Sequence, residues 1–432
     1  MMRNWAGNHV YVAHRVHEPS SIEELQELVR AAPRLRVIGS RHSFNAIADT
    51  DGDHVSLARM PRVLEIDASA GTADVDGGVR YGDVCAPLDR AGFGLHNMAS
   101  LPHISIAGAC ATGTHGSGAR SGNLATAVVG VEIVRADGAL VHVTAAQPGQ
   151  LGAAAVSLGC LGVITRITLA VEPAYQVRQD VFEDLPIRAF AEHFDEISAA
   201  GDSVSFFTEW GSDAIDQVWI KRRVDPATPP PPLPDLFGAK PATGERHPIR
   251  RLSPEACTPQ LGVPGPWFER LPHFRMDHTP SSGDELQSEY FVEVERAPDA
   301  FLALHRLRGA IAPLIQVSEV RSIAADELLL SPASGRPSVA FHFTWQPDWP
   351  AVRQLLPAIE RALEPFEPRA HWGKLFTLPP EAVRARYPRL PEFVTIAEAF
   401  DPAGTFRNAF VDRFVFGEAG GISVERRMSS GR

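Results

Sequence analysis

Two loops rich in glycine and hydroxyl residues constrain the N-terminal third of this chain. The first loop runs from Gly39 to Asn45 and follows a short apolar run, Leu35 to Ile38, that is typical of a strand. The second loop runs from Ser100 to Gly118. Glycine lacks the Cβ that would hold a ligand away from the main chain, and it tolerates positive φ, so such loops bring backbone N–H groups close to an anion. The pattern favours a cofactor that carries phosphate.

Neither loop has the spacing of a common nucleotide-binding motif. The nearest approach to Gly-x-Gly-x-x-Gly is Gly116-x-Gly118-x-x-Ser121, whose last residue is wrong and which does not connect a strand to a helix. The sequence also lacks a Gly-x-x-x-x-Gly-Lys-Ser/Thr phosphate loop, a His-Glu-x-x-His metal motif and a Gly-x-Ser-x-Gly nucleophile elbow. A cofactor bound by these loops therefore requires a fold other than the Rossmann fold.

The composition is that of an ordinary globular protein. The chain has 432 residues, 44% of them hydrophobic and 22% charged, and this length predicts two closely packed domains. The formal net charge of −11 argues against a nucleic-acid partner, because proteins that bind nucleic acids need a basic surface. No feature of the sequence indicates a protein partner.

The cysteines and the N-terminus bear on metal binding and location. Cys85, Cys110, Cys160 and Cys257 lie far apart without a Cys-x-x-Cys pair, so we expect buried reduced thiols and no metal site. Residues 1–8 contain no apolar signal segment, and no stretch reaches the ~18 apolar residues that span a membrane. We expect a cytoplasmic protein that does not associate with membranes.

Short strands and helices are predicted up to about residue 174. Ser20 and Glu23 form a capping box, which predicts a helix through Val29. Asp137-Gly138 joins two apolar runs and predicts a β-hairpin with a primed turn. The strands expected here are residues 35–38, 63–66, 72–75, 128–134, 140–143 and 163–171.

Beyond residue 174 the pattern changes to longer strands. The expected strands are 204–210, 217–221, 290–294, 314–323 and 339–345, and the expected helices are 189–199, 299–310 and 351–363. A proline-rich stretch begins at Asp225 and continues without regular structure to about Pro266, which indicates a lid, a surface excursion or a domain edge. The whole chain is predicted to be α+β.

Four later segments, together with the two loops, resemble a known flavoprotein family. These segments are Glu319-Val320-Arg321, His342-Phe343-Thr344-Trp345, His371-Trp372-Gly373-Lys374 and Asp401-Pro402-Ala403-Gly404-Thr405-Phe406. The chain resembles the family of vanillyl-alcohol oxidase and the sugar-lactone oxidases, and within it the bacterial alditol and xylitol oxidases. The resemblance implies a PCMH-type FAD-binding domain at residues 1–174, a substrate-binding cap domain on an antiparallel sheet at 175–390, and a C-terminal segment at 391–432 that returns to the FAD domain.

The resemblance implies that FAD is attached covalently to His42. A histidine in a polar loop is more often a solvated or hydrogen-bonded residue, but Gly-Ser-x-His-Ser matches the position of the flavinylated histidine. A neutral imidazole nitrogen can add to the 8-methyl carbon of the flavin, and the bond tends to raise the redox potential. The other residues assigned to FAD are Ile38, Gly39, Ser40, Arg41, Ser43, Ser105, Gly108, Gly113, Thr114, Ser117, Gly118, Ile164 and His371. Residues 113–118 are expected along the diphosphate, and Ile164 at the adenine.

Glu319 and Arg321 are expected to act on the substrate. They lie two residues apart in an alternating run, so their side chains share one face of a strand. A solvated surface ion pair would look the same, but the resemblance puts this pair over the flavin, with Ser105, Thr344 and Lys374 as further substrate ligands. Arg321 and Lys374 would stabilise a developing alkoxide, with Glu319 beside them, or Lys374 would accept the proton if burial lowers its pKa.

The resemblance implies an FAD-dependent alditol oxidase. Such an enzyme oxidises the terminal hydroxyl of an acyclic polyol such as xylitol or sorbitol to an aldose and reduces dioxygen to hydrogen peroxide. A cluster of polar ligands suits a substrate with a hydroxyl on every carbon, because an apolar ligand would leave them unpaired. Two alternatives remain: a sugar-1,4-lactone oxidase or dehydrogenase of the same family, and a flavin-free binding protein that keeps the fold.

Overall fold

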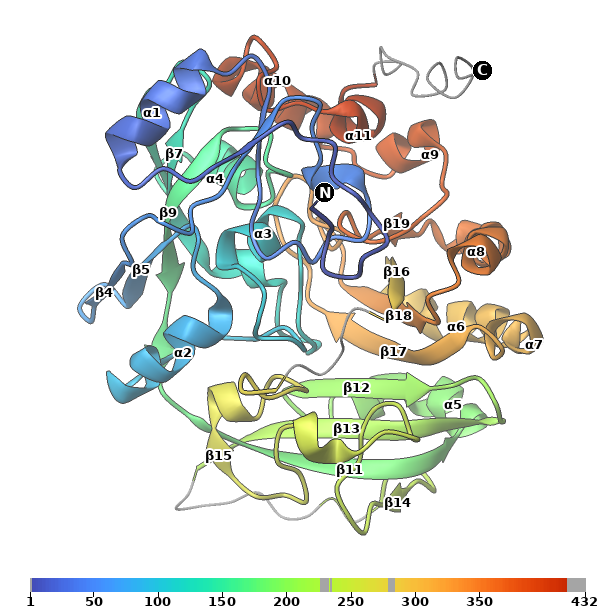
Figure 1. Cartoon of the computed structure of the whole chain (residues 1–432). Helices are drawn as coiled ribbons and strands as arrows, with labels where there is room; N and C mark the ends of the chain where they lie inside the picture. The colour runs from blue at the N-terminus through green and yellow to red at the C-terminus, as the bar shows by residue number, and fades with distance from the viewer. Residues whose placement is uncertain (1, 226–232, 234, 279–283, 418–432) are drawn as a thin grey trace.

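The computed structural model describes residues 2–225, 233, 235–278 and 284–417. It confirms the predicted α+β class, because helices surround a five-stranded and a nine-stranded antiparallel sheet that lie in different halves of the molecule (Figure 1). All four cysteines are buried and free. Within the described residues, no helix is long and apolar enough to cross a membrane.

The N-terminal half positions both glycine-rich loops. Its five-stranded sheet has the order β4, β5, β9, β7, β8, and a small parallel sheet has the order β1, β3, β2. The strands are β1 (Val16–His17), β2 (Leu35–Val37), β3 (Asp53–Val55), β4 (Leu64–Asp67), β5 (Thr72–Asp76), β6 (Phe93–Gly94), β7 (Val128–Val134), β8 (Leu140–Thr144), β9 (Val163–Ala170) and β10 (Glu172–Pro173), and the α-helices are α1 (Ile22–Ala31), α2 (Tyr81–Arg90), α3 (Ile106–Ala111) and α4 (Pro148–Ala155). Strand β2 leads into the first loop, and α3 lies within the second.

Helix α1 begins one residue later than the capping box predicted. Its N-cap is Ser21, whose side chain accepts a hydrogen bond from the Glu24 backbone N–H, so the prediction of Ser20 with Glu23 was wrong. Ser20 instead donates its hydroxyl proton to the Glu24 carboxylate at 3.0 Å. The sequence contains two overlapping Ser-x-x-Glu patterns, and in the folded helix Leu25 and Val29 face the core.

The predicted hairpin of β7 and β8 is present, but its turn is not primed. Val134 pairs with Leu140, and the Arg135 N–H donates to Ala139 O at 2.9 Å, which leaves a three-residue loop. Gly138 has a φ of +76°, whereas Asp137 does not have positive φ. A primed turn of type I′ needs positive φ at both central residues, while a three-residue loop needs glycine at its last position alone.

The larger sheet belongs to the second half of the chain. Its order is β14, β11, β13, β12, β17, β18, β16, β19, and β15 also pairs with β11. The strands are β11 (Gln176–Pro186), β12 (Ser203–Thr208), β13 (Ala214–Val224), β14 (Lys240–Pro241), β15 (Gly265–Pro266), β16 (Leu286–Glu293), β17 (Ile315–Ile323), β18 (Ser338–Trp345) and β19 (Arg369–Ala370), and the α-helices are α5 (Ile187–Ser198), α6 (Ala297–His305), α7 (Arg308–Ile311) and α8 (Trp349–Leu363). This sheet faces the N-terminal half (Figure 1).

The two faces of the larger sheet differ in chemistry. On one face Phe206 packs against Phe190 of α5, which in turn contacts Phe301 of α6, with ring centroids 5.0 and 4.6 Å apart. On the other face the register pairs Glu319 with His342, and His342 with Glu289. Residues paired across antiparallel strands share a face, so ionisable side chains from β16, β17 and β18 form a row.

The proline-rich stretch partly joins the larger sheet. Its described part contributes β14 and β15, which both pair with β11, so the expectation of a stretch without regular structure is corrected there. Residues 226–232 and 234, which include half of its prolines, lie outside the described residues. The predicted domain boundaries at residues 174 and 390 stay an interpretation.

The C-terminal segment packs against β2. Helix α9 (Pro380–Ala385) precedes this segment, α10 (Leu390–Phe400) begins it, and α11 (Ala409–Val411) and a π-helical turn at Asp412–Phe416 follow. The Leu35 N–H donates to Thr405 O at 2.8 Å, and Arg36 Nη1 donates to Phe406 O at 2.7 Å. These bonds fix the strand from which the first loop leaves.

Candidate active site

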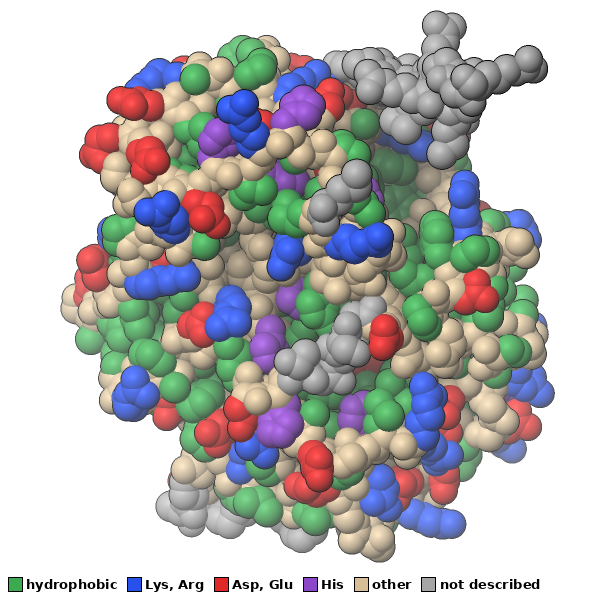
Figure 2. Space-filling model, viewed as in Figure 1, with side chains coloured by type: hydrophobic (Ala, Val, Ile, Leu, Met, Phe, Trp, Pro, Cys, Tyr) green, Lys and Arg blue, Asp and Glu red, His purple; other side chains and the backbone are tan. Residues whose placement is uncertain are grey.

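A cavity of about 910 Å³ lies between the two halves. One wall comes from parts of segments 36–44, 99–115 and 157–164, and the other comes from the polar face of the larger sheet and from segment 371–374. Figure 2 shows histidine side chains along a band that runs from the N-terminal half down to the larger sheet. The described residues contain no group of three or more His, Cys, Asp and Glu side chains that could hold a metal ion.

The two glycine-rich loops meet at Ser105. A Cβ built on Gly39 would lie 2.5 Å from Ser105 Oγ, and one built on Gly108 would lie 2.7 Å from the same atom. The Ser105 backbone N–H also donates to Ser40 Oγ at 3.1 Å. A side chain at either position would crowd Ser105, so glycine lets the loops approach each other this closely.

His42 projects from the first loop into the wall of the cavity. Its ring stacks on Trp5, with centroids 5.0 Å apart and an interplanar angle of 23°. Nδ1 is buried and has no hydrogen-bond partner among the described residues. Burial, with the neighbouring His103 as a smaller cause, lowers the pKa of His42 to about 4. The imidazole is therefore neutral near pH 7, with one ring nitrogen unused.

Arg41 adopts a backbone conformation that is uncommon for a residue with a side chain. Its φ is +61°, in the left-handed region. The Trp5 N–H donates to Arg41 O at 2.9 Å, and Arg41 Nη1 donates to Arg3 O at 3.4 Å. The guanidinium thus contacts the N-terminal segment.

Most of the residues predicted to bind the cofactor line the cavity. They are Ile38, Gly39, Ser40, Arg41, His42, Ser43, Ser105, Gly108, Thr114, Ile164 and His371. The backbone of Gly77, just after β5, lies very close to the backbone of Ile164. A Cβ built on Gly77 would lie 2.0 Å from Ile164 O. Loop, strand and cap residues that are distant in sequence therefore share one cavity.

Three predicted residues, Gly113, Ser117 and Gly118, do not line this cavity. They contact the second half of the chain instead: Ser117 Oγ lies 2.5 Å from Ser203 Oγ, and the Gly118 N–H donates to Ser322 O at 2.8 Å. Gly113 and Gly118 both have positive φ, which turns the second loop toward the larger sheet. The structure therefore gives these residues contacts between the halves, and their expected role along the diphosphate stays a prediction.

Glu289, which the sequence analysis missed, is the centre of the polar face. It is 1% exposed. Arg321 Nη2 donates to its Oε1 at 2.7 Å, Lys374 Nζ donates to its Oε2 at 2.5 Å, and His115 Nε2 lies 3.2 Å from Oε1. Glu289 thereby joins the two predicted catalytic cations, which come from different segments of the chain.

The first loop also holds the segment that carries Lys374. Asn45 Nδ2 donates to Trp372 O and to Lys374 O, both at 2.8 Å, and the Phe44 N–H donates to Gly373 O at 2.7 Å. The loop that contains His42 is therefore bonded directly to the backbone of Lys374.

Opposing effects of burial and charge set the protonation of this cluster. Burial alone would raise the pKa of Glu289, but Lys374, His115 and Arg321 outweigh it and hold that pKa well below its usual range. Burial would likewise raise the pKa of Glu319, and Arg321 and His273 lower it. Burial lowers the pKa of Lys374, while Glu289 opposes the shift. Two carboxylates thus stay ionised beside two cations.

Thr344 lies next to the cluster through His342. Lys374 Nζ is 2.8 Å from His342 Nδ1, and His342 Nε2 is 3.0 Å from Thr344 Oγ1. Because an ammonium has protons and no lone pair, His342 Nδ1 must accept, which leaves Nε2–H to donate to Thr344. Burial and Lys374 lower the pKa of His342 to about 4, in agreement with a neutral ring.

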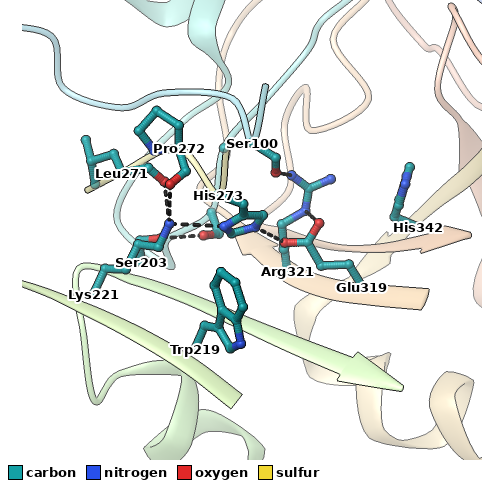
Figure 3. Close-up of polar contacts among 12 residues, drawn as sticks. Ser100, Ser203, Trp219, Lys221, Leu271, Pro272, His273, Glu319, Arg321 and His342 are labelled. Carbon is teal, nitrogen blue, oxygen red and sulfur yellow. Dashed lines mark hydrogen bonds and ion pairs between the residues drawn. The ribbon is translucent and has the colours of Figure 1, made fainter. Parts of the chain in front are cut away.

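Glu319 has a separate set of partners that the sequence analysis also missed. His273 Nε2 lies 2.7 Å from Glu319 Oε1, and Lys221 lies behind His273 (Figure 3). His273 belongs to a segment without regular structure, and Lys221 lies on β13, so no local pattern connects them to Glu319. The sequence offered one signal for Lys221: it is an ionisable residue at an inward position of an otherwise apolar strand.

Comparison with known proteins identifies two sequence families in the chain. A family described as FAD binding domain matches residues 13–144, and a family described as D-arabinono-1,4-lactone oxidase matches residues 284–414. The first match contains both glycine-rich loops up to Gly118, and the second contains Glu289, Glu319, Arg321, Thr344 and Lys374.

Curated relatives match over nearly the whole chain. An alditol oxidase from Streptomyces sp. (strain IKD472 / FERM P-14339) is 48% identical over 413 residues, which cover 94% of this chain and 97% of that protein. An L-gulono-1,4-lactone dehydrogenase from Mycobacterium tuberculosis (strain ATCC 25618 / H37Rv) is 28% identical over 95% of this chain and 98% of its own length. An L-gulonolactone oxidase from Bos taurus is 25% identical over 96% and 98%, respectively.

Proposed function

The chain belongs to the FAD-linked oxidoreductase family of vanillyl-alcohol oxidase type, and from this premise we propose that it is an alditol oxidase. It oxidises the terminal hydroxyl of acyclic polyols such as xylitol and sorbitol to aldoses and reduces dioxygen to hydrogen peroxide. The observation that carries the proposal is the set of buried polar side chains on the larger sheet, which faces the loop of His42 across one cavity.

The residues of the cavity fit FAD. Gly39 and Gly108 both pack against the small side chain of Ser105, so only a serine hydroxymethyl group lies between the two loops at this point. His42 supplies a neutral imidazole with an unused nitrogen, which suits a covalent bond to the cofactor. A bound FAD would supply the acceptor for a hydride from the carbinol carbon and the carrier of two electrons to dioxygen.

The polar side chains predicted to bind the substrate suit a polyol. Ser105, Glu319, Arg321, Thr344 and Lys374 all line the cavity and supply both donors and acceptors of hydrogen bonds. Each hydroxyl of the substrate needs both kinds of partner in a buried site, because an unpaired buried polar group is costly. An acyclic polyol, which has a hydroxyl on every carbon, satisfies more of these groups than a ligand with few hydroxyls.

Arg321 and Lys374 act on the reacting hydroxyl. Lys374 Nζ donates to Glu289 and His342, so one N–H of the ammonium stays for a substrate oxygen. Glu289 favours the charged form of Lys374, which supports a role in stabilising negative charge on that oxygen. The alternative role as proton acceptor draws its support from burial, which lowers the Lys374 pKa.

A lactone substrate is the second candidate. It is favoured by the match of residues 284–414 to a family described as D-arabinono-1,4-lactone oxidase, and by relatives named as an L-gulono-1,4-lactone dehydrogenase and an L-gulonolactone oxidase. These relatives are less similar to the chain than the Streptomyces alditol oxidase. A screen of oxygen consumption with xylitol, sorbitol and γ-lactones separates the two candidates.

The experiment that tests the proposed function uses the purified flavoprotein. Anaerobic xylitol should bleach the visible flavin absorbance, and Lys374→Met should slow this reduction by about 10²- to 10³-fold while the flavin stays bound. Lys240→Met on the edge strand β14 is the matched control, since Lys240 is exposed and does not line the cavity. Reduction by lactones without reduction by any polyol would overturn the proposal, as would a protein without bound flavin.

A further inference from the structure

A third cation lies behind the polar face of the larger sheet. Lys221 on β13 is 1% exposed. Its Nζ donates to Leu271 O at 2.5 Å and to Pro272 O at 3.1 Å, and it lies 3.0 Å from His273 Nδ1 (Figure 3). An ammonium has three N–H groups and no lone pair. The three acceptors therefore match the three protons of the charged form.

Lys221 determines which nitrogen of His273 carries the proton. Because the ammonium can only donate, His273 Nδ1 must present its lone pair to Lys221, and the ring proton is then on Nε2. Nε2 lies 2.7 Å from Glu319 Oε1, so its N–H donates to the carboxylate. Trp219 and Phe207 hold the imidazole edge-on, at centroid distances of 5.3 and 5.4 Å.

Glu319 depends on this connection because the nearer cations are engaged with Glu289. Arg321 donates to Glu289 through Nη2 at 2.7 Å, and Lys374 donates to Glu289 at 2.5 Å. Arg321 Nε faces Glu319 Oε2 at 3.4 Å as an ion pair, but it makes no hydrogen bond within the described part of the chain. The short hydrogen bond from His273 is therefore the contact that orients the Glu319 carboxylate.

We propose that Lys221 and His273 are positioning residues for Glu319. Lys221 fixes the tautomer of His273, His273 holds one carboxylate oxygen of Glu319, and the other oxygen stays oriented into the cavity as an acceptor for a substrate hydroxyl. Neither residue needs to touch the reacting carbon. The inference rests on the proposed function where it concerns the substrate, and on the structure alone where it concerns the tautomer.

Variants at His273 separate positioning from simple packing. In His273→Gln the amide oxygen can accept from Lys221 and the amide nitrogen can donate to Glu319, whereas His273→Leu removes both bonds. Lys221→Met removes the charge at similar length. His54→Leu is the control, because His54 is buried, bonds Ala48 O at 2.8 Å and lies outside the cavity lining.

The first measurement is anaerobic flavin reduction by xylitol at several concentrations. His273→Leu and Lys221→Met should weaken the apparent xylitol affinity by about 10- to 100-fold, as expected for the loss of a hydrogen bond to a charged group, with a smaller change in the limiting rate. His273→Gln should stay within about threefold of the parent protein. Equal damage in His273→Gln and His273→Leu would overturn the proposal, as would parental affinity in both Lys221→Met and His273→Leu.

A pH series adds a signature that packing would not produce. Burial lowers the pKa of Lys221 to about 7, while Glu319 opposes the shift; Cys257 and Arg321 are the other ionisable groups acting on Lys221, with His273 in direct contact. Gln179 and Ser203, which pair with Lys221 on β11 and β12, do not titrate. Xylitol affinity should weaken as pH rises through about 7, and Lys221→Met should abolish this inflection.

The second measurement needs no substrate. With 15N-histidine labelling, the resonances of His273 are those absent from His273→Gln, and they should report a proton on Nε2 in the parent protein and a shifted equilibrium in Lys221→Met. A proton on Nδ1 in the parent protein overturns the proposal even if polyols are oxidised. Failure of every polyol to reduce the flavin, with the Nε2 tautomer observed, overturns the proposed substrate and leaves the role of Lys221 standing.

Discussion

Lys374 Nζ and Glu289 Oε2 lie 2.5 Å apart, although 85 residues separate them in the sequence. The carboxylate is fully buried on β16, and the ammonium comes from the segment that the first loop holds through Asn45. Because Glu289 also binds Arg321 at 2.7 Å, one buried carboxylate sets the spacing of the two cations that face the cavity.

The first prediction concerns Glu289→Gln, which keeps the shape of the side chain and removes its charge. Arg321 and Lys374 would then be buried without their shared counter-ion, so the Lys374 pKa should fall further and its charge near pH 7 should be partly lost. Breaking a buried ion pair costs about 3–5 kcal/mol of stability, and we expect flavin reduction by xylitol to slow by about 10²-fold.

Glu360→Gln is the matched control for that substitution. Glu360 is also buried, but it binds Tyr290 Oη at 2.9 Å and the Thr377 N–H at 2.6 Å, away from the cavity lining. Burial raises the pKa of Glu360, so the change to glutamine removes less charge. A Glu289→Gln enzyme that reduces its flavin at the parental rate would falsify the central role given to this carboxylate.

A second prediction is the covalent attachment of FAD to His42. Acid-precipitated protein should remain yellow, and the denatured band on a gel should fluoresce under ultraviolet light. His42→Ala should release all of its flavin on denaturation, because the unused ring nitrogen that suits the bond is gone. If the parent protein releases its flavin completely on denaturation, the attachment is wrong even though FAD binds.

Acid stability gives a third prediction, with a definite sign. Burial lowers the pKa of His42, His247, His273 and His342 to about 4, from an ordinary value of 6.5. Between these two values the unfolded chain binds more protons than the folded chain, so the free energy of unfolding should fall as pH decreases from about 6.5 to about 4. His247→Gln should reduce that slope by about 1.4 kcal/mol per pH unit, the effect of one proton.

Urea titrations at several pH values test this slope. Carboxyls whose pKa is raised by burial, namely Asp216, Asp326, Glu360 and Asp401, act in the opposite direction as they take up protons. They are present in both proteins, so the difference between His247→Gln and the parent isolates the imidazole. An identical slope in the two proteins would show that His247 is not buried in its neutral form.

The backbone of Arg41 leads to a fourth prediction. A non-glycine residue in the left-handed region costs about 1 kcal/mol, and Arg41 has a φ of +61°. Arg41→Gly should therefore raise the free energy of unfolding by about 1 kcal/mol. The loss of the weak hydrogen bond from the Arg41 guanidinium to Arg3 O reduces this gain slightly. Arg41→Ala removes the guanidinium and keeps the strain, so stabilisation by both substitutions would contradict this explanation.

Much of the fold was predictable because strand patterns are local. The apolar alternation around β7, β8, β17 and β18 located strands to within a few residues, and the two loops with their later matching segments indicated FAD. The alternation of side chains along a strand also predicted that Glu319 and Arg321 share one face. In the structure both line the same cavity as His42.

Glu289 was missed for a physical reason. The strand was predicted to begin at Tyr290, because Gln287, Ser288 and Glu289 are polar and read as a loop, whereas β16 begins at Leu286. Glu289 is buried with partners on β17 and in the Lys374 segment, and the register between strands is not encoded in any local pattern. The contacts of Ser117 and Gly118 with the larger sheet depend on the same long-range packing.

The last prediction concerns the electron acceptor. The similarity to an alditol oxidase favours dioxygen, and Ser105 and Gly108 are among the residues that line the cavity proposed to hold the flavin. Gly108 has no Cβ, and one placed there would lie 2.7 Å from Ser105 Oγ, so an added methyl group would crowd the cavity wall at this point. Enzyme reduced anaerobically with xylitol should recover its oxidised spectrum within seconds in air-saturated buffer, with one hydrogen peroxide formed per flavin. Gly108→Ala should slow this recovery more than it slows reduction by xylitol. Recovery over many minutes, together with rapid reduction of a dye or a cytochrome, would instead identify a dehydrogenase, the activity named for the Mycobacterium tuberculosis relative.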